Sequence, residues 1–135
     1  MYLLDTDTCI EFLRGNLAFG RTTLEQNDPR LFGVPAIVRA ELLLGAAKSN
    51  WAQENRLIVE SFLLPLETIP FDGSCAEAYA RIRADLESSG RRIGPNDLFI
   101  AATAVARSAV LVTNNVREFS RVEGLLLESW AGTEL

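Results

Sequence analysis

The segment YLLDTDTCIEFLRG, residues 2–15, shows how the fold begins. Three apolar residues, Tyr2–Leu4, are typical of a short buried strand, and Asp5 follows at once. Thr8 and Glu11 have the spacing of a capping box, and the glycine at the end of the segment supplies a stop. The segment therefore predicts a strand that leads through a polar turn into a helix.

The same alternation of strand and helix continues along the chain. Further strands are predicted at Leu31–Val34, Thr68–Phe71, Val110–Val112 and Leu125–Leu127. Further helices are predicted from Pro35 to Lys48, from Trp51 to Leu64, from the capping box Ser74–Glu77 to Gly90, and from the turn Gly94–Asn96 to Arg107. Residues 16–30 are ambiguous apart from a turn at 27–29. This order predicts an α/β fold with a mainly parallel sheet, and residues 1–135 are expected to form one domain.

Composition excludes several kinds of active site. The 135 residues are 48% hydrophobic and 23% charged, the balance of a globular domain, and the net charge of −5 opposes wholesale wrapping of nucleic acid. Histidine is absent, which removes the Ser-His-Asp triad, the Cys-His dyad and every His-ligated metal site. Two cysteines, Cys9 and Cys75, are too few for a zinc cluster or a disulfide framework. Two free thiols, with no signal peptide or membrane span indicated, predict a cytoplasmic protein.

Ligands of open parallel sheets bind beyond the carboxyl ends of the strands, and two aspartates are candidates for such a site. Asp5 directly follows the first strand, and Asp97 lies in the first turn of a later helix. Either could be a helix cap or a favourable charge at a helix N-terminus. We expect Thr8 and Asn96 to cap those helices instead, which leaves both aspartates without a structural task. Asp7 suits either role.

Glu41 lies on or beside an apolar stripe of its predicted helix. The stripe consists of Ile37, Ala40, Leu44 and Ala47 at helical spacing. A carboxylate there is costly unless a metal, a cation or a hydrogen-bond donor meets it. The structural alternative is an arginine partner at the edge of the stripe.

Polar residues also follow the strand Val110–Val112. Thr113 comes first, and Asn115 and Glu118 have the spacing of a capping box, although Asn115 at a strand end also suits the orientation of a water or a phosphate. Clustered carboxylates repel one another unless a cation offsets them, and oxygen ligands select Mg²⁺ or Mn²⁺. Without histidine, the expected nucleophile is a metal-activated water that attacks a phosphodiester. Twelve arginines against one lysine suit contacts to phosphate, although most are expected to be solvated.

Four blocks in order carry a resemblance to a known family. They are LLDTD at 3–7, RAELLLGA at 39–46, IGPNDLFIAA at 93–102 and LVTNNVREF at 111–119. The chain resembles the PIN-domain ribonucleases, and within them the VapC toxins of VapBC toxin–antitoxin modules. The resemblance implies a five-stranded parallel sheet flanked by helices, Mg²⁺- or Mn²⁺-dependent RNA cleavage, and metal ligation by Asp5, Asp97 and Glu41. Asn115 stands where the family commonly has a fourth aspartate, and the expected supporting residues are Thr6, Asp7, Asn96, Thr113 and Glu118.

The resemblance also implies partners. The last block is similar to that of the branch that cuts initiator tRNA in its anticodon loop. A homodimer is implied, together with a VapB-like antitoxin whose tail covers the active site and whose other end binds operator DNA. Two alternatives stay open: a DNA-directed nuclease of the same fold, and an inactive PIN-like module that binds RNA or protein. A phosphoaspartyl enzyme fails because it needs a late lysine, whereas the single lysine is Lys48.

Overall fold

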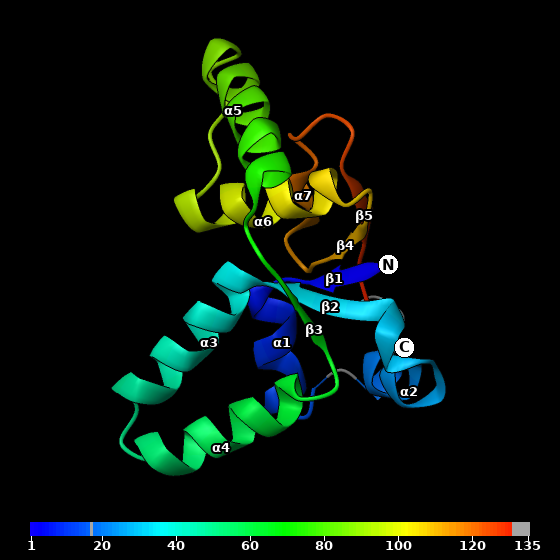
Figure 1. The fold of residues 1–135 in the computed structure, drawn as a ribbon, viewed down its shortest axis with the longest axis vertical. Helices are drawn as coiled ribbons and strands as arrows, with labels where there is room; N and C mark the ends of the chain where they lie inside the picture. The colour runs from blue at the N-terminus through cyan, green and yellow to red at the C-terminus, as the bar shows by residue number, and fades with distance from the viewer. Residues whose placement is uncertain (17, 131–135) are drawn as a thin grey trace.

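The computed structural model describes residues 1–16 and 18–130 and places five parallel strands in one sheet (Figure 1). In chain order the strands are β1 (Tyr2–Leu4), β2 (Phe32–Pro35), β3 (Glu67–Ile69), β4 (Val110–Val112) and β5 (Leu126–Glu128). Across the sheet the order is β3-β2-β1-β4-β5, and each neighbouring pair is parallel. The first three strands therefore extend the sheet from β1 to one side, and β4 and β5 extend it from β1 to the other side. This confirms the predicted α/β class.

Helices cover both faces of the sheet. They are α1 (Thr6–Leu13), α2 (Ala18–Gln26), α3 (Ala36–Lys48), α4 (Ala52–Leu63), α5 (Gly73–Ser88), α6 (Pro95–Ala106) and α7 (Val116–Phe119), with a short 3₁₀ turn at Pro29–Leu31. In Figure 1, α1 to α4 lie below the strands and α5 to α7 lie above them. Among the described residues, no helix is long and apolar enough to cross a membrane.

The two central strands carry the most deeply buried side chains. Leu3 and Leu4 of β1 and Leu111 and Val112 of β4 have no exposed surface. Burial of each such aliphatic side chain contributes about 1.5–3 kcal/mol relative to exposure. Ala101, Ala102 and Ala104 of α6 are equally buried, and their small side chains let this helix contact β2 and β4 closely. The core thus fixes the ends of β1, β4 and α6 relative to one another.

The predicted helix caps at three places are wrong. Helix α1 begins at Thr6 with Asp5 as its N-cap, rather than at the Thr8 capping box. Helix α5 begins at Gly73 with Asp72 as its N-cap, rather than at Ser74. Helix α6 begins at Pro95, and its N-cap Gly94 has no capping side chain, so Asn96 does not cap it. In α1 and α5 the aspartate that directly precedes the helix accepts a hydrogen bond from the backbone N–H of the helix's third residue. The short aspartate side chain is well suited to this capping bond.

The predicted apolar stripe of α3 is also wrong. The buried face consists of Val38, Leu42 and Ala46, whereas Ala40 and Leu44 are exposed. Apolar residues occur on several sides of this helix, so their spacing alone does not select the face that packs. Smaller differences are the helix α2, which was not predicted, and shifts of one or two residues at the bounds of β2, β3 and β5, while the short helix α7 begins at the helix start expected near Asn115.

Candidate active site

The site lies where the sheet order reverses. Strands β1 and β4 are neighbours, β1 continues through α1 toward β2, and β4 continues toward β5 on the other side. Ligands of open α/β sheets bind beyond the carboxyl ends of the strands at such a reversal. Asp5 follows β1 and Thr113 follows β4, and the first turn of α6 brings Asp97 to the same end of the sheet.

Asp5 is both a helix cap and a buried acid. Its Oδ1 accepts a hydrogen bond from the backbone N–H of Thr8 at 2.9 Å. Only 3% of the residue's surface is exposed. Burial raises the pKa of the Asp5 carboxyl, while hydrogen bonds with Thr113 and Thr8 partly oppose that shift. The expectation that Asp5 has no structural task is therefore wrong. The cap holds the carboxylate still in a place where its charge is poorly solvated.

Asp97 is the most perturbed acid of the site. Burial, and after it the negative charges of Glu118, Asp5, Glu41 and Asp7 in that order, together raise its pKa to about 6. A Cβ built on Gly94 would lie 3.5 Å from Asp97 Oδ2 and 3.9 Å from Glu118 Oε1, so both carboxylates lie over the same backbone position. The five acids named from the sequence thus act on one another.

Glu41 is held from two sides. The Thr6 hydroxyl donates to its Oε1 at 2.7 Å, and Asn96 Nδ2 donates to its Oε2 at 3.1 Å. These bonds join α3 to the starts of α1 and α6. Within the described part of the chain Glu41 has no ion pair, so the arginine partner weighed from the sequence is absent there. Glu41 reaches the cluster from a half-buried position, not from the buried face of α3.

Glu118 completes the acidic cluster from α7. Its Oε1 accepts the backbone N–H of Gly94 at 2.8 Å, and its Oε2 accepts a hydrogen bond from Asn115 Nδ2. Asn115 itself is positioned by its backbone N–H, which donates to Thr113 Oγ1 at 2.9 Å. Asn115 is the N-cap residue of α7, but its side chain makes no capping bond, so the predicted capping box is wrong. Its amide instead restrains Glu118 beside Asp97.

Comparisons with known proteins now identify the family. Residues 2–125 match the PIN domain. Ribonuclease VapC2 of Rickettsia felis is 38% identical over 96% of this chain and 98% of its own length, and tRNA(fMet)-specific endonuclease VapC of Shigella flexneri is 35% identical over the same shares. The chain belongs to the VapC ribonucleases of the PIN-domain family. In the crystal structure of DNA-bound VapBC from Salmonella typhimurium, a chain 37% identical superposes with a TM-score of 0.91 over 96% of this chain and 97% of that one.

Membership makes this chain a toxin-class ribonuclease and removes the inactive binding module and the phosphoaspartyl enzyme as readings of its function. A VapC ribonuclease cleaves RNA, so the DNA-directed nuclease of the same fold is not favoured. The sheet order and the strand-end aspartates belong to the part of the chain that matches the PIN domain.

The donor set of this VapC site suits a hard divalent cation. The acids offer oxygen atoms only, and in the described residues no lysine or arginine is paired with Asp5, Glu41, Asp97 or Glu118. The same residues include no group of three His, Cys, Asp or Glu side chains arranged to hold one ion. Mg²⁺ does not need such a cage, because it commonly takes one or two carboxylates and keeps several waters. The pKa of Asp97 is raised chiefly by burial and then by the neighbouring acids, and a cation at this place would offset the repulsion among them.

Some features of the site were not found from the sequence. The Gly94 N–H that holds Glu118 is a backbone group, and only the Gly-Pro pair before α6 could have drawn attention to it. The Thr8 hydroxyl donates to the Val112 carbonyl oxygen at 3.2 Å and so ties α1 to the end of β4. Thr8 was taken for a cap, whereas its hydroxyl is used in the core.

Proposed function

We propose that Asp5 and Asp97 bind the Mg²⁺ or Mn²⁺ that this VapC ribonuclease uses to hydrolyse RNA phosphodiesters. The observation that carries the proposal is the convergence of carboxylates from the end of β1, from α3 and from the first turn of α6, with no basic partner among the described residues. A bound ion would lower the pKa of a neighbouring water and so favour the hydroxide that attacks phosphorus.

The protein's own residues orient this chemistry. Asp5 is fixed by its bond from the Thr8 N–H, and the Thr6 hydroxyl and Asn96 amide hold both oxygens of Glu41. Because those oxygens already accept bonds, we assign Glu41 to the edge of the cation site, where it adds negative charge. Asn115 is the fourth catalytic residue in this proposal. Its Nδ2 restrains Glu118, and its amide oxygen, which accepts no hydrogen bond from the described residues, would orient a water or a phosphate.

We infer that the substrate is a tRNA, with the anticodon loop of initiator tRNA as the first candidate. Support comes from the Shigella flexneri relative, which is named a tRNA(fMet)-specific endonuclease, and from the 96% of this chain over which the two align. Arginine is the main base of this chain, and its planar guanidinium matches phosphate oxygens and stacks on unpaired bases.

We also infer a VapB-like antitoxin as partner. The relatives from Salmonella typhimurium and Rickettsia felis were solved as VapBC complexes. A groove of about 370 Å³ between α1, α3 and α4 offers a seat for such a partner; it is lined by Ile10, Leu13, Arg14, Glu41, Leu42, Gly45, Ala46, Asn55, Ile58 and Val59. Because Glu41 forms part of its wall, a segment bound in this groove would reach the acidic cluster and block it.

A second copy of the chain is the other proposed partner. An apolar hollow of about 330 Å³ runs between α3 and α6, lined by Ala36, Ile37, Ala40, Phe71, Phe99 and Thr103. The hollow explains why the apolar residues on this side of α3 are not covered by the chain's own core. Exposed apolar surface of this kind marks an interface, and we assign it to the homodimer.

End-mapping of total tRNA after incubation with the purified protein tests the catalytic proposal. We expect one discrete cut in Mg²⁺ or Mn²⁺ that disappears in EDTA and in Asp97→Asn, while the variant keeps its circular dichroism spectrum. Glu77→Gln, an exposed acid on α5, is the matched control and should cut like the unsubstituted protein. Cleavage by Asp97→Asn at the unsubstituted rate would overturn the site. Cleavage of other RNA but not tRNA, in a parallel arm with messenger RNA and DNA, would overturn the substrate.

A further inference from the structure

Two groups of arginines differ in their partners, apart from Arg39 and Arg121, which each donate a side-chain hydrogen bond without forming an ion pair. Five described arginines form an ion pair with a nearby acid: Arg14, Arg30, Arg56, Arg83 and Arg107. Four others have neither an ion pair nor a side-chain hydrogen bond among the described residues: Arg81, Arg91, Arg92 and Arg117. A guanidinium without an anionic neighbour remains available to an anionic ligand. The second group gathers near the loop that joins α5 to α6 and near α7.

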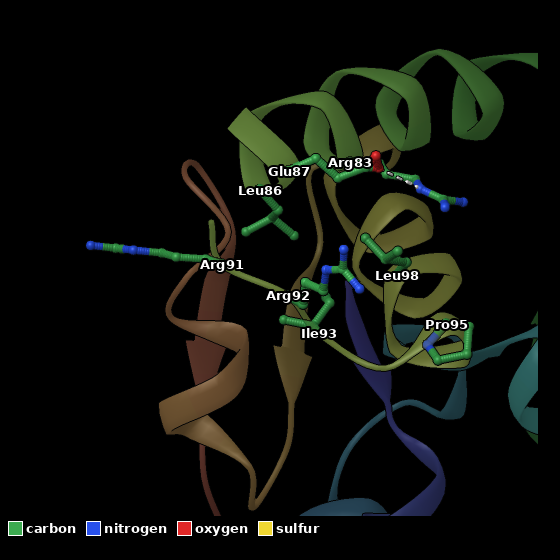
Figure 2. Close-up of a pocket in the computed structure, with 8 residues that line it drawn as sticks. All are labelled: Arg83, Leu86, Glu87, Arg91, Arg92, Ile93, Pro95 and Leu98. Carbon is green, nitrogen blue, oxygen red and sulfur yellow. Dashed lines mark hydrogen bonds and ion pairs between the residues drawn. The ribbon is translucent and has the colours of Figure 1, made fainter. Parts of the chain in front are cut away.

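Two adjoining hollows are built around this loop. The first has a volume of about 250 Å³ and is lined by Arg83, Leu86, Glu87, Arg91, Arg92, Ile93, Pro95 and Leu98. Figure 2 shows Arg92 pointing into the space between α5 and α6, and Arg91 extending away on the opposite side. The second hollow, of about 440 Å³, shares Leu86 and Arg91 with the first, and its other charged lining residues are Arg81, Asp85, Arg121 and Glu123. Arg91 therefore lines both hollows, whereas Arg92 lines the first alone.

The loop is tied to the acidic cluster. Arg121 Nη1 donates to the Arg92 carbonyl oxygen at 2.6 Å, and the Gly94 N–H donates to Glu118 at 2.8 Å. Pro95 lines the first hollow and begins α6, two residues before Asp97. The two loop arginines thus precede Asp97 by only five and six residues, and the backbone between them is held from α7.

The positive charge of this loop lies beside the acidic cluster of a negatively charged chain. The chain carries a net charge of −5, and its clustered acids repel a polyanion unless cations flank them. Resting on the assignment of Asp97 to the cation site, we propose that Arg91 and Arg92 bind the phosphodiester backbone of the RNA next to the phosphate that is cut. The hollows around Leu86 and Leu98 then leave room for the nucleotide that those phosphates carry, with its base against apolar side chains.

The test compares two charge-matched double variants in the Asp97→Asn background, where RNA is bound but not cut. Arg91→Ala with Arg92→Ala removes the proposed contacts, and Arg30→Ala with Arg56→Ala removes two arginines that are paired with Asp28 and Glu60. Each double variant lowers the net charge by two, so a general charge effect cancels. The probe is bulk bacterial tRNA in Mg²⁺, and its dissociation constant is measured by fluorescence anisotropy across a series of salt concentrations.

We expect the Arg91/Arg92 variant to bind tRNA about tenfold or more weakly near 0.1 M salt, and the slope of log K against log salt to fall by about 1.4, since each single-strand phosphate contact contributes about 0.7. The Arg30/Arg56 variant should keep the original slope. With Asp97 intact, Arg91→Ala/Arg92→Ala should raise KM far more than it lowers kcat, and Arg91→Lys/Arg92→Lys should restore part of the slope.

Equal affinity and slope in the two double variants would overturn the proposal. So would a loss of kcat at unchanged KM, because that result assigns the arginines to the chemical step. A failure of the catalytic assignment looks different: Asp97→Asn would then still cut tRNA, whatever its affinity. Both arginines are exposed, and an unchanged Tm of the double variant confirms that lost binding does not come from unfolding.

Discussion

Asp5 and Asp72 have the same structural role in different surroundings. Both precede a helix in extended conformation, and Oδ1 of each accepts the N–H three residues later, at 2.9 Å for Asp5 and 3.1 Å for Asp72. Burial raises the pKa of Asp5. Hydrogen bonds from Ser74 and Cys75, and more weakly the charge of Arg107, lower the pKa of Asp72 to about 2.

The comparison shows that a cap is no evidence against function. Asp72 faces solvent and has Arg107 at 3.5 Å, so its charge is satisfied by the protein. Asp5 has no ion pair among the described residues, and the charge of Asp7 acts against its ionisation. An aspartate whose negative charge the protein leaves unbalanced is suited to a cation, whereas a balanced one serves the helix alone.

The largest effect is expected from Asp5→Asn set beside Asp72→Asn. Asparagine keeps the side-chain oxygen that caps the helix, so both variants should fold. Removal of the Asp5 charge should lower kcat/KM for RNA cleavage in Mg²⁺ about a thousandfold or more, because a cation contributes several kcal/mol to the transition state. Asp72→Asn should remain within about twofold, since that cap only positions α5. Cleavage by Asp5→Asn within tenfold of the unsubstituted rate would contradict its role as a ligand.

The sequence predicted candidate residues for the site, and the structure corrects what surrounds two of them. The fold followed from local alternation, because each strand and the helix after it are contiguous in the chain. Asp5 and Glu41 were selected by arguments that the structure corrects: Asp5 caps α1, and Glu41 does not lie on the buried face of α3. Both corrections concern tertiary packing. Which side of α3 meets the sheet, and which acid reaches the first N–H of α1, depend on elements that the local pattern does not contain.

Contacts between distant segments were the least predictable. Glu41 accepts hydrogen bonds from Thr6, which is 35 residues away in the sequence, and from Asn96, which is 55 residues away. Glu118 accepts one from Gly94, 24 residues away. The acids were grouped from the sequence only by their shared chemistry and by the resemblance of whole blocks, because helical or strand spacing carries no information over such separations. The backbone donor of Gly94 has no side chain to mark it, and it emerged from the structure alone.

A smaller effect is expected from Glu41→Gln, which asks whether Glu41 resembles Asp5 or merely supports it. Both Glu41 oxygens accept hydrogen bonds, and glutamine turns one of them into a donor that faces Thr6 or Asn96. We expect a loss of about 10- to 100-fold in kcat/KM, the range for groups that orient metal ligands. Thr6→Val, which removes one donor and leaves the acid, should cost less. A loss in Glu41→Gln as large as in Asp5→Asn would make Glu41 a direct ligand.

The smallest effect is on stability, where Asp97 and Asp72 should respond to pH in opposite ways. The pKa of Asp97 is about 6 in the folded protein and 3.8 as its ordinary value, so the folded state binds more protons between pH 4 and 6 and loses stability as pH rises through that window. The pKa of Asp72 is about 2, so its contribution is present above pH 3.8 and is lost as pH falls toward 2.

Thermal unfolding in EDTA from pH 3 to 8 measures this contrast. The decline in Tm between pH 4 and 6 that Asp97 contributes, a few degrees at most, should be missing in Asp97→Asn and retained in Asp72→Asn. Mg²⁺ at pH 7 should restore the lost Tm in the unsubstituted protein, because a ligand that binds the folded state stabilises it. Cleavage at limiting Mg²⁺ should likewise fall below pH 6, as protons compete for Asp97. If Asp97→Asn and the unsubstituted protein show the same dependence of Tm on pH, the charge of Asp97 does not destabilise the folded protein. Asp97 and Asp72 would then differ only in how deeply they are buried.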